Sequence, residues 1–440
     1  MLRNIFILFT LPLACSALGQ TLEAKLDSLF SAVDQPNVPG AAIVITRGNT
    51  IHFSKGYGIA DLEHNVPVTD STVFMVASVS KQFTAYAIAL LATHGEISLQ
   101  DPVTDYIPEL NSVSPSITIQ HLVYHTSGLR DEFTLLALAG YRMDDQITKE
   151  DILRLIYRQR ELNFNPGTRY LYSNSGYTLL AEIIERVSGQ SFADWTHENL
   201  FQPLGMMDSH FRSTTEQITP NVASGYITTS DGYRAQRVNY SSVGASGLYT
   251  TTLDLGRWLI ALRNSELGGS QTQELAHTRG ITSHGDTLNY AFGLSYGRFR
   301  GTEFIGHSGS HRGYRAWAGR FPDHDLGIAV LGNLEEFDPH QMAQKVASLF
   351  IEEKSLYAYE GIYHSRELDN TIYISLESDT LRASSQRGKL ATLSRTGRDS
   401  FRSDTWYLSS FDFKRDTTGV IGFHTSSGRS HDIWFEKKDQ

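Results

Sequence analysis

A serine and a lysine three positions apart, Ser78 and Lys81, form the pattern that most directly predicts chemistry in this sequence. The residues before Ser78 are typical of a strand and those after it of a helix, so Lys81 would lie one turn beyond Ser78 on the same helical face. The free N–H groups at a helix start can stabilise an oxyanion, and a partly neutral amine can take the proton of a serine hydroxyl. The alternative interpretation is structural: Ser78 caps the helix and Lys81 lies on the surface.

A second candidate is Tyr172, two residues before Asn174, in a Tyr-x-Asn pattern that occurs once. It follows the turn-forming residues 165–168, which predicts a loop leading into a helix. A phenol beside a lysine can relay protons, and an asparagine amide can hold a substrate carbonyl or the lysine itself. The alternative is a loop tyrosine followed by an asparagine that caps a helix.

The third candidate is the run His307, Ser308, Gly309 and Ser310, at the end of a predicted strand over residues 303–307. A glycine there would let the backbone of a ligand approach closely. The N–H of Ser310 could complete an oxyanion hole with that of Ser78. The alternative is that His307 is a hydrogen-bonded residue of the core.

Other catalytic patterns are weak or missing from the sequence. His121 and His125 have the i, i+4 spacing of helical zinc ligands, but no glutamate lies between them and no third ligand is evident. No serine is centred in Gly-x-Ser-x-Gly, and no glycine-rich phosphate loop follows a predicted strand. We therefore expect no metal and no cofactor.

The composition is that of a folded, mildly acidic protein. The chain has 440 residues, 38 Lys and Arg against 48 Asp and Glu, and a net charge of −10, with no basic run, which argues against a nucleic-acid partner. A single cysteine, Cys15, excludes an internal disulfide framework. No stretch is apolar enough to cross a membrane. A small-molecule or peptide substrate is the expected partner, and the oligomeric state stays open.

The first 19 residues have the pattern of a signal peptide. Arg3 precedes an apolar run, and small residues at positions 17 and 19 predict cleavage before Gln20. This predicts export to the periplasm or the medium. One alternative is a lipid anchor on Cys15, within a sequence that resembles a lipobox; another is a helix that stays part of the fold.

Hydrophobic periodicity predicts two structural regions. Two strands near the start and several near the end bracket a mostly helical middle, so the simplest fold is an α/β (α+β) arrangement: one antiparallel sheet flanked by helices, with an inserted helical lobe. Short alternating runs after residue 354, over 357–363, 371–376, 380–383, 406–413, 419–423 and 431–435, predict a small all-β barrel or sandwich. We thus expect domains over 20–354 and 355–440. The predicted strands are 41–47, 51–58, 290–296, 303–307, 314–321 and 326–331; the predicted helices are 22–33, 80–94, 152–159, 179–187, 253–263 and 341–352.

The three motifs in this order resemble those of the serine β-lactamase-like superfamily. Flanking stretches are similar too: residues 121–129, the Pro166-Gly167 pair and residues 244–248. The resemblance covers about residues 22–350. That superfamily includes class C β-lactamases, D-alanyl-D-alanine carboxypeptidases, D-aminopeptidases and serine esterases. It implies a β-lactamase/transpeptidase-like sheet.

The resemblance also implies a role for each residue. Ser78 would be the acylated nucleophile, Lys81 and Tyr172 the proton-transfer pair, and Asn174 a ligand of the substrate amide. His307 stands where many members carry a lysine, which favours the D-aminopeptidase and esterase branches because an imidazole is mostly neutral near pH 7. Arg312 and Arg315 follow shortly after it and could restore the positive charge, so anionic substrates stay open. Two alternatives remain: a β-lactamase, and a catalytically silent penicillin-binding or sensor protein.

Overall fold

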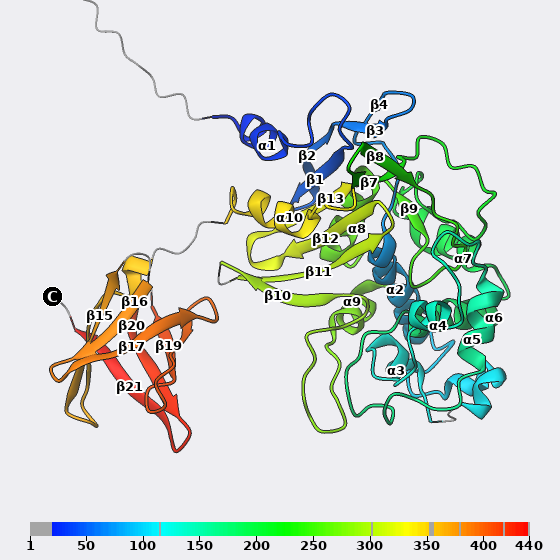
Figure 1. The fold of residues 1–440 in the computed structure, drawn as a ribbon. Coiled ribbons are helices and arrows are strands. Elements are labelled where there is room, and N and C mark those ends of the chain that lie inside the picture. Colours follow the sequence, from blue (N-terminus) through cyan, green and yellow to red (C-terminus); the bar gives the residue numbers. More distant parts are fainter. Residues whose placement is uncertain are drawn as a thin grey trace, which may run out of the picture.

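The computed structural model describes residues 20–113, 116–300, 302–351, 356–377, 380–416 and 419–438 (Figure 1). The predicted signal peptide, residues 1–19, lies outside these ranges, and so does the predicted domain boundary at residues 354 and 355. Two structural units lie on either side of that boundary, and each is described by itself.

The first unit is built around one antiparallel sheet to which both ends of the unit contribute. The N-terminal strand β1 pairs with β13, the last strand of the unit, with Ala41 opposite Gly332 and Arg47 opposite Leu326. This confirms the predicted sheet. In spatial order its strands are β10 (Ser295–Phe299), β11 (Thr302–His311), β12 (Tyr314–Phe321), β13 (Leu326–Gly332), β1 (Ala41–Arg47) and β2 (Thr50–Tyr57).

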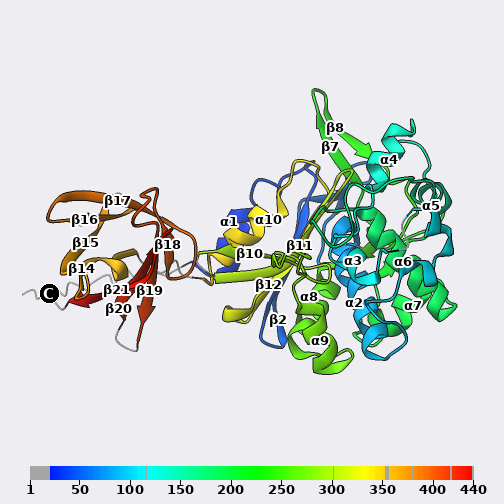
Figure 2. The same cartoon turned by 90° about the horizontal axis from the view of Figure 1, so that it is seen from below.

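Helices cover both faces of this sheet. Strand β1 is an almost continuous apolar run: Ile43 and Ile45 enter one core, whereas Ala42 and Val44 enter the other. Successive side chains of a strand point to opposite faces of the sheet, so this almost fully buried strand contributes side chains to both cores. The first core is covered by α1 (Leu22–Phe30) and α10 (Pro339–Ala347), the second by α8 (Thr252–Asn264) and α2 (Ser80–Thr93) (Figure 2).

A helical lobe is inserted between α2 and β10, as predicted. Its helix α6 packs against α2 and brings the segment around Tyr172 to the start of α2. Three small sheets accompany the lobe: β3 (Ile59–Asp61) with β4 (Val66–Pro67), β5 (Phe74–Met75) with β9 (Leu248–Thr250) and β6 (His210–Phe211), and β7 (Gly225–Thr229) with β8 (Gly232–Gln236). Its helices are α3 (Ile119–Val123), α4 (Glu132–Leu138), α5 (Lys149–Tyr157), α6 (Asn174–Ser188), α7 (Phe192–Thr196) and α9 (Gly269–His277).

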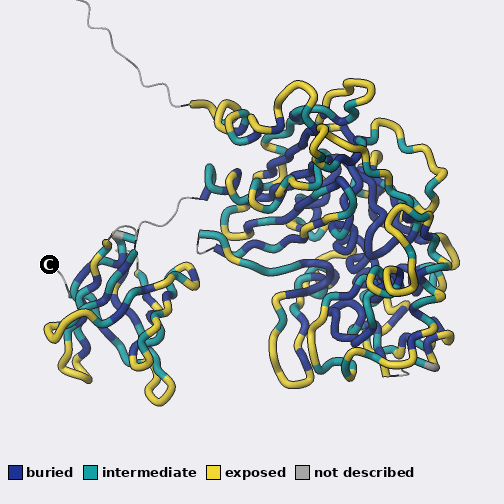
Figure 3. Tube along the Cα trace, in the orientation of Figure 1, coloured by how far each residue is buried: buried dark blue, intermediate teal, exposed yellow. Residues whose placement is uncertain are grey.

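The second unit is a closed antiparallel barrel of eight strands, the barrel alternative of the prediction. Pairing of β14 with β21 closes it, so neither edge stays open. Its core is separate from the other two and is rich in aromatic side chains such as Phe411 and Phe423. Buried stretches alternate with exposed ones along the barrel strands (Figure 3). The strands are β14 (Gly361–Ser365), β15 (Asn370–Glu377), β16 (Thr380–Ser385), β17 (Gly388–Arg395), β18 (Ser400–Arg402), β19 (Ser410–Arg415), β20 (Val420–Ser427) and β21 (Ser430–Lys438).

Several predicted elements differ from the structure in their bounds. The strand predicted over 290–296 begins only at Ser295, and the helix predicted over 341–352 runs from Pro339 to Ala347. Strands β17 and β18 were missed. Among the described residues, no helix is long and apolar enough to cross a membrane.

Candidate active site

Ser78 lies in a short 3₁₀ turn, Ala77–Val79, directly before α2. The sequence alternative, a helix-capping serine, is not what the structure has: the N-cap of α2 is Val79, and no side chain caps that end. The Ser78 Oγ is instead 3.1 Å from Lys81 Nζ. Ala77 has a φ of 47°, which is costly for a residue with a Cβ and marks a backbone held in place by its surroundings.

Lys81 is completely buried in α2, contrary to the surface alternative. Its amine has three oxygen neighbours: Ser78 Oγ, Asn174 Oδ1 at 2.8 Å and the carbonyl of Ala245 at 2.8 Å. Burial lowers the pKa of Lys81 to about 7, against the opposing attraction of the Glu132 and Asp131 carboxylates. A substantial fraction of this lysine is therefore a neutral amine near pH 7.

Tyr172 completes the surroundings of the serine hydroxyl. Lys81 Nζ lies 4.9 Å from the centre of its ring, and the Ser78 side chain is close enough to the phenol to lower its pKa, although burial has the larger effect. Burial raises the pKa of Tyr172, so the phenol keeps its proton at neutral pH. A protonated phenol next to a neutral amine can pass protons to and from the serine oxygen.

Asn174 is the first residue of α6 and faces Lys81. Both its backbone N–H and its side-chain Nδ2 donate to one oxygen of Asp131, each at 2.8 Å. Sequence reasoning did not assign Asp131 a role. The one signal available was its place just after the flanking stretch 121–129.

Gly309 lies against the turn that carries Ser78. A Cβ on this residue would lie 2.1 Å from the carbonyl oxygen of Val76 and 3.2 Å from the N of Ser78. The glycine therefore lets β11 approach the turn Ala77–Val79 that carries Ser78. Ser310, the next residue, lines the cavity that contains Ser78.

His307 lies next to Tyr172 rather than among the cavity-lining residues. Its Nδ1 is 2.6 Å from the carbonyl of Ser308, its Nε2 is 3.2 Å from the hydroxyl of Tyr290, and its ring centre is 6.0 Å from that of Tyr172. Burial lowers the pKa of His307 to about 4, so the imidazole is neutral. Both ring nitrogens of His307 thus have hydrogen-bond partners inside the protein.

The two histidines with zinc-like spacing point to other partners. Nδ1 of His121 accepts from the N–H of Thr118, and Nδ1 of His125 accepts from the N–H of Ser173, each at 3.1 Å. Within the described ranges, no group of three or more His, Cys, Asp or Glu residues could hold a metal ion.

The candidate cavity has a volume of about 310 Å³ and two chemically different walls. Phe133 and Met143 form an apolar part. Ser246 adds a buried hydroxyl that has no hydrogen-bond partner within the described residues. The other lining residues are Ala77, Ser78, Asn174, Ser310, His311, Arg312, Arg315 and Glu335.

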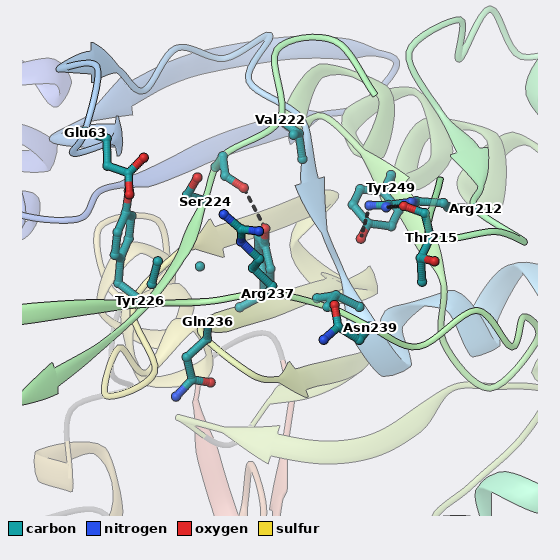
Figure 4. A pocket seen from close by; sticks show the side chains of 15 residues that line it. Glu63, Arg212, Thr215, Val222, Ser224, Tyr226, Gln236, Arg237, Asn239 and Tyr249 are labelled. Atoms are coloured by element: carbon teal, nitrogen blue, oxygen red, sulfur yellow. Dashed lines mark hydrogen bonds between the residues drawn. The ribbon is translucent and has the colours of Figure 1, made fainter. Parts of the chain in front are cut away.

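A second cavity of about 350 Å³ lies between β7, β8 and β9 (Figure 4). Arg212 and Tyr249 line it, but the guanidinium of Arg212 already donates to the Tyr249 hydroxyl and to the carbonyls of Thr214 and Thr215. Because these polar groups already have hydrogen-bond partners within the protein, they do not indicate a ligand site.

Comparisons with known proteins identify the family of this chain. The family model described as beta-lactamase matches residues 26–349. The chain is similar to a D-aminopeptidase of Cereibacter sphaeroides, with 30% identity over 70% of this chain and 60% of that protein. It is also similar to penicillin-binding protein 4* of Bacillus subtilis, with 28% identity over 74% of each chain. The match thus spans less than two thirds of the D-aminopeptidase.

The fold comparison extends over the barrel as well. An octameric penicillin-binding protein homologue from Pyrococcus abyssi superimposes with a TM-score of 0.65 and 24% identity, over 95% of this chain and 99% of that one. That likeness shows the fold of both units. From its family match and its fold, this chain belongs to the β-lactamase family, a family of serine hydrolases.

Proposed function

We propose that this protein is a serine hydrolase that cleaves an ester or amide bond through an acyl-enzyme on Ser78. The single observation that carries the proposal is the 3.1 Å contact of the Ser78 hydroxyl with the buried amine of Lys81, next to which the ring of Tyr172 lies. A weak nucleophile needs an adjacent base, and Lys81 has the burial that keeps an amine partly neutral.

In the proposed reaction, Ser78 Oγ attacks the substrate carbonyl while its proton passes to Lys81 Nζ. The backbone N–H groups of Ser78 and Ser310 hold the oxyanion. The proton then reaches the leaving group through Tyr172, and the C–N or C–O bond breaks to leave the acyl-enzyme. Water attacks that ester, gives its proton back through the same pair, and releases the acid and the free Ser78.

The cavity favours a short substrate that carries no free carboxylate at the site. Arg312 is bonded to Asp144 and to the carbonyl of Arg237, and Arg315 is 3.5 Å from Glu335. Each arginine thus already has a carboxylate partner, which leaves little unpaired positive charge. The apolar wall of the cavity suits a side chain or acyl group.

We infer that a peptide-like substrate would lie along β11. Strand β10 pairs with β11 only over residues 302–306, so within the described residues 307–311 have a strand neighbour on one side only, β12. An open strand edge beside the nucleophile can align an extended backbone. The similarity to a D-aminopeptidase makes peptides that begin with a D-amino acid the first candidates, with small esters beside them.

The proposal is tested with a panel of p-nitrophenyl esters, D-amino-acid p-nitroanilides and the β-lactam nitrocefin. We expect turnover of esters or D-anilides that disappears in Ser78→Ala. Turnover of nitrocefin alone would support the β-lactamase alternative. No turnover of any of the three, together with stable acylation by a penicillin, would support the silent penicillin-binding alternative.

We also propose export, with residues 1–19 removed as a signal peptide. An N-terminus at Gln20 in material from the periplasm or the medium would support it. A lipid-modified Cys15 at the mature N-terminus would replace it with a membrane anchor.

A further inference from the structure

We propose that Asp131 is a positioning residue whose carboxylate fixes the Asn174 amide in the orientation that leaves the Lys81 lone pair to Ser78. The inference rests on the acyl-enzyme chemistry proposed above. It adds a residue that neither the motifs nor the comparisons single out.

The contacts of Asp131 divide between its two carboxylate oxygens. Oδ2 accepts from the backbone N–H and from Nδ2 of Asn174, both at 2.8 Å. Oδ1 caps α4 by accepting from the N–H groups of Phe133 at 3.0 Å and Thr134 at 3.3 Å. One side chain therefore joins the start of α4 to the start of α6.

The carboxylate determines which way the Asn174 amide faces. A carboxylate accepts hydrogen bonds and does not donate them, so the Nδ2 donor of Asn174 must face Asp131. The Oδ1 acceptor then has to face the other way, toward Lys81 Nζ, where it is found at 2.8 Å.

This orientation decides where the lone pair of Lys81 is available. A neutral amine has two N–H donors and one lone pair. Asn174 Oδ1 and the carbonyl of Ala245 can only accept, so they take the two N–H groups. The lone pair is left for the third neighbour, the hydroxyl of Ser78 at 3.1 Å, which is the arrangement that a general base needs.

A flipped amide would defeat this arrangement. Nδ2 of Asn174 would then face Lys81 Nζ and donate to the same lone pair that Ser78 requires. The hydrogen bonds of the Asn174 side chain within the described residues are to Lys81 and Asp131, so Asp131 is the group that prevents the flip.

Charge gives the inference a second readout. The Asp131 charge raises the pKa of Lys81, so its removal should lower that pKa. Loss of a helix cap alone would not move it. The titratable groups that face Lys81 from the surrounding elements are Asp131, Glu132, Tyr172, Tyr177, His125 and His307.

The experiment measures kcat/KM for a neutral p-nitrophenyl ester against pH in Asp131→Asn and Asp131→Ser. Serine keeps a capping acceptor for α4 but lacks the second oxygen. We expect both variants to lower the plateau by about 10–100-fold and to move its inflection to lower pH. Asp338→Asn is the matched control, because Asp338 caps α10 by accepting from the N–H of Gln341 at 2.9 Å. We expect this control to leave the profile unchanged.

A double-mutant comparison tests whether Asp131 acts through Asn174. In an Asn174→Ala background, Asp131→Asn should cause little further loss. Fully additive losses of kcat/KM would overturn the inference. So would Asp131 variants whose pH profile keeps the plateau and the inflection of the unmodified protein. If Ser78→Ala itself stayed active, the acyl-enzyme proposal would fail first. If Ser78→Ala is inactive and the losses add, only the role of Asp131 fails.

Discussion

The amine of Lys81 is the group on which the account of the site depends most. It lies inside α2 with no exposed surface, and its hydrogen-bond partners are oxygen atoms of a serine, an asparagine and a backbone carbonyl. Desolvation penalises the charged form, and the carboxylates of Asp131 and Glu132 offset it only in part. The low proton affinity of the amine thus follows from packing.

This environment predicts the pH dependence of the reaction. The pKa of Lys81 is lowered to about 7, so the amine is protonated and inactive as a base below that pH and free above it. We expect kcat/KM for a neutral ester to rise with pH and to level off above an inflection near 7. The rate is measured from about pH 5 to 9 under conditions where the fold is intact. A profile that falls through pH 7 would assign a different base.

Chelation gives a second prediction at the residue scale. Because His121 and His125 each use Nδ1 to accept a backbone N–H, they are not arranged as a ligand pair. We expect EDTA to leave hydrolysis unchanged. If EDTA abolished hydrolysis and added zinc restored it, the paired histidines would be metal ligands after all.

The sequence predicted the residues of the site that follow local patterns. Ser78 and Lys81 are one helical turn apart, so their contact is visible from spacing. Asp131 lies 43 residues before Asn174, and its role depends on how α4 and α6 pack, which no local pattern encodes. The burial of His307 outside the cavity lining is likewise a tertiary property.

Among the elements, strand β11 and the turn Ala77–Val79 that carries Ser78 depend on each other for their position. Gly309 lets the strand lie against Val76 and Ser78, where a Cβ would come within 2.1 Å of a backbone oxygen. The backbone cannot move aside as a flexible side chain could. The short distance between β11 and Ser78 therefore depends on the absence of a side chain at Gly309.

We predict that Gly309→Ala lowers both activity and stability. The added methyl must push β11 away from the turn that carries Ser78. This should lower the unfolding free energy by about 1–3 kcal/mol and displace Ser310. Thermal unfolding and ester turnover measure the two effects. Gly428→Ala is a suitable control, because a Cβ there meets nothing within 4 Å. Full activity in Gly309→Ala would contradict the close approach.

The elements that were predicted wrongly show where periodicity misleads. Residues 290–294 are rich in buried apolar side chains such as Tyr290 and Phe292, which resembles a strand. Gly293, however, has a φ of 66°, and its Cβ position is 2.3 Å from the carbonyl of Lys81, so the chain turns there against α2. In strand β17 the consecutive apolar residues Leu390 and Ala391 interrupt the strict alternation that marks a strand in the sequence, although Ala391 and Leu393 are its buried residues.

At the scale of the whole molecule, the larger unit and the barrel have separate cores. The core that includes Phe411 and Phe423 shares no residue with the two cores of the larger unit. We therefore expect the domains 20–354 and 355–440 to be separable. The barrel, of about 85 residues, has the smaller margin of stability.

Limited proteolysis tests this division. We predict cleavage between Glu352 and Tyr359, which yields two fragments, and a chain of residues 20–354 that is soluble and hydrolyses esters. Mass spectrometry locates the cut, and circular dichroism follows the fold of each fragment. An insoluble 20–354 chain would mean that the units stabilise each other.

The most direct test of the central claim is the attachment of a serine-reactive phosphonate. A fluorescent phosphonate is incubated with the folded protein, and intact mass and peptide mapping locate the label. We expect one label per chain, on Ser78, and none on Ser78→Ala. The unfolding free energy of this variant should change by no more than about 0.5 kcal/mol, because Ser78 caps no helix. A label on another serine, or equal labelling of Ser78→Ala, would contradict the central claim.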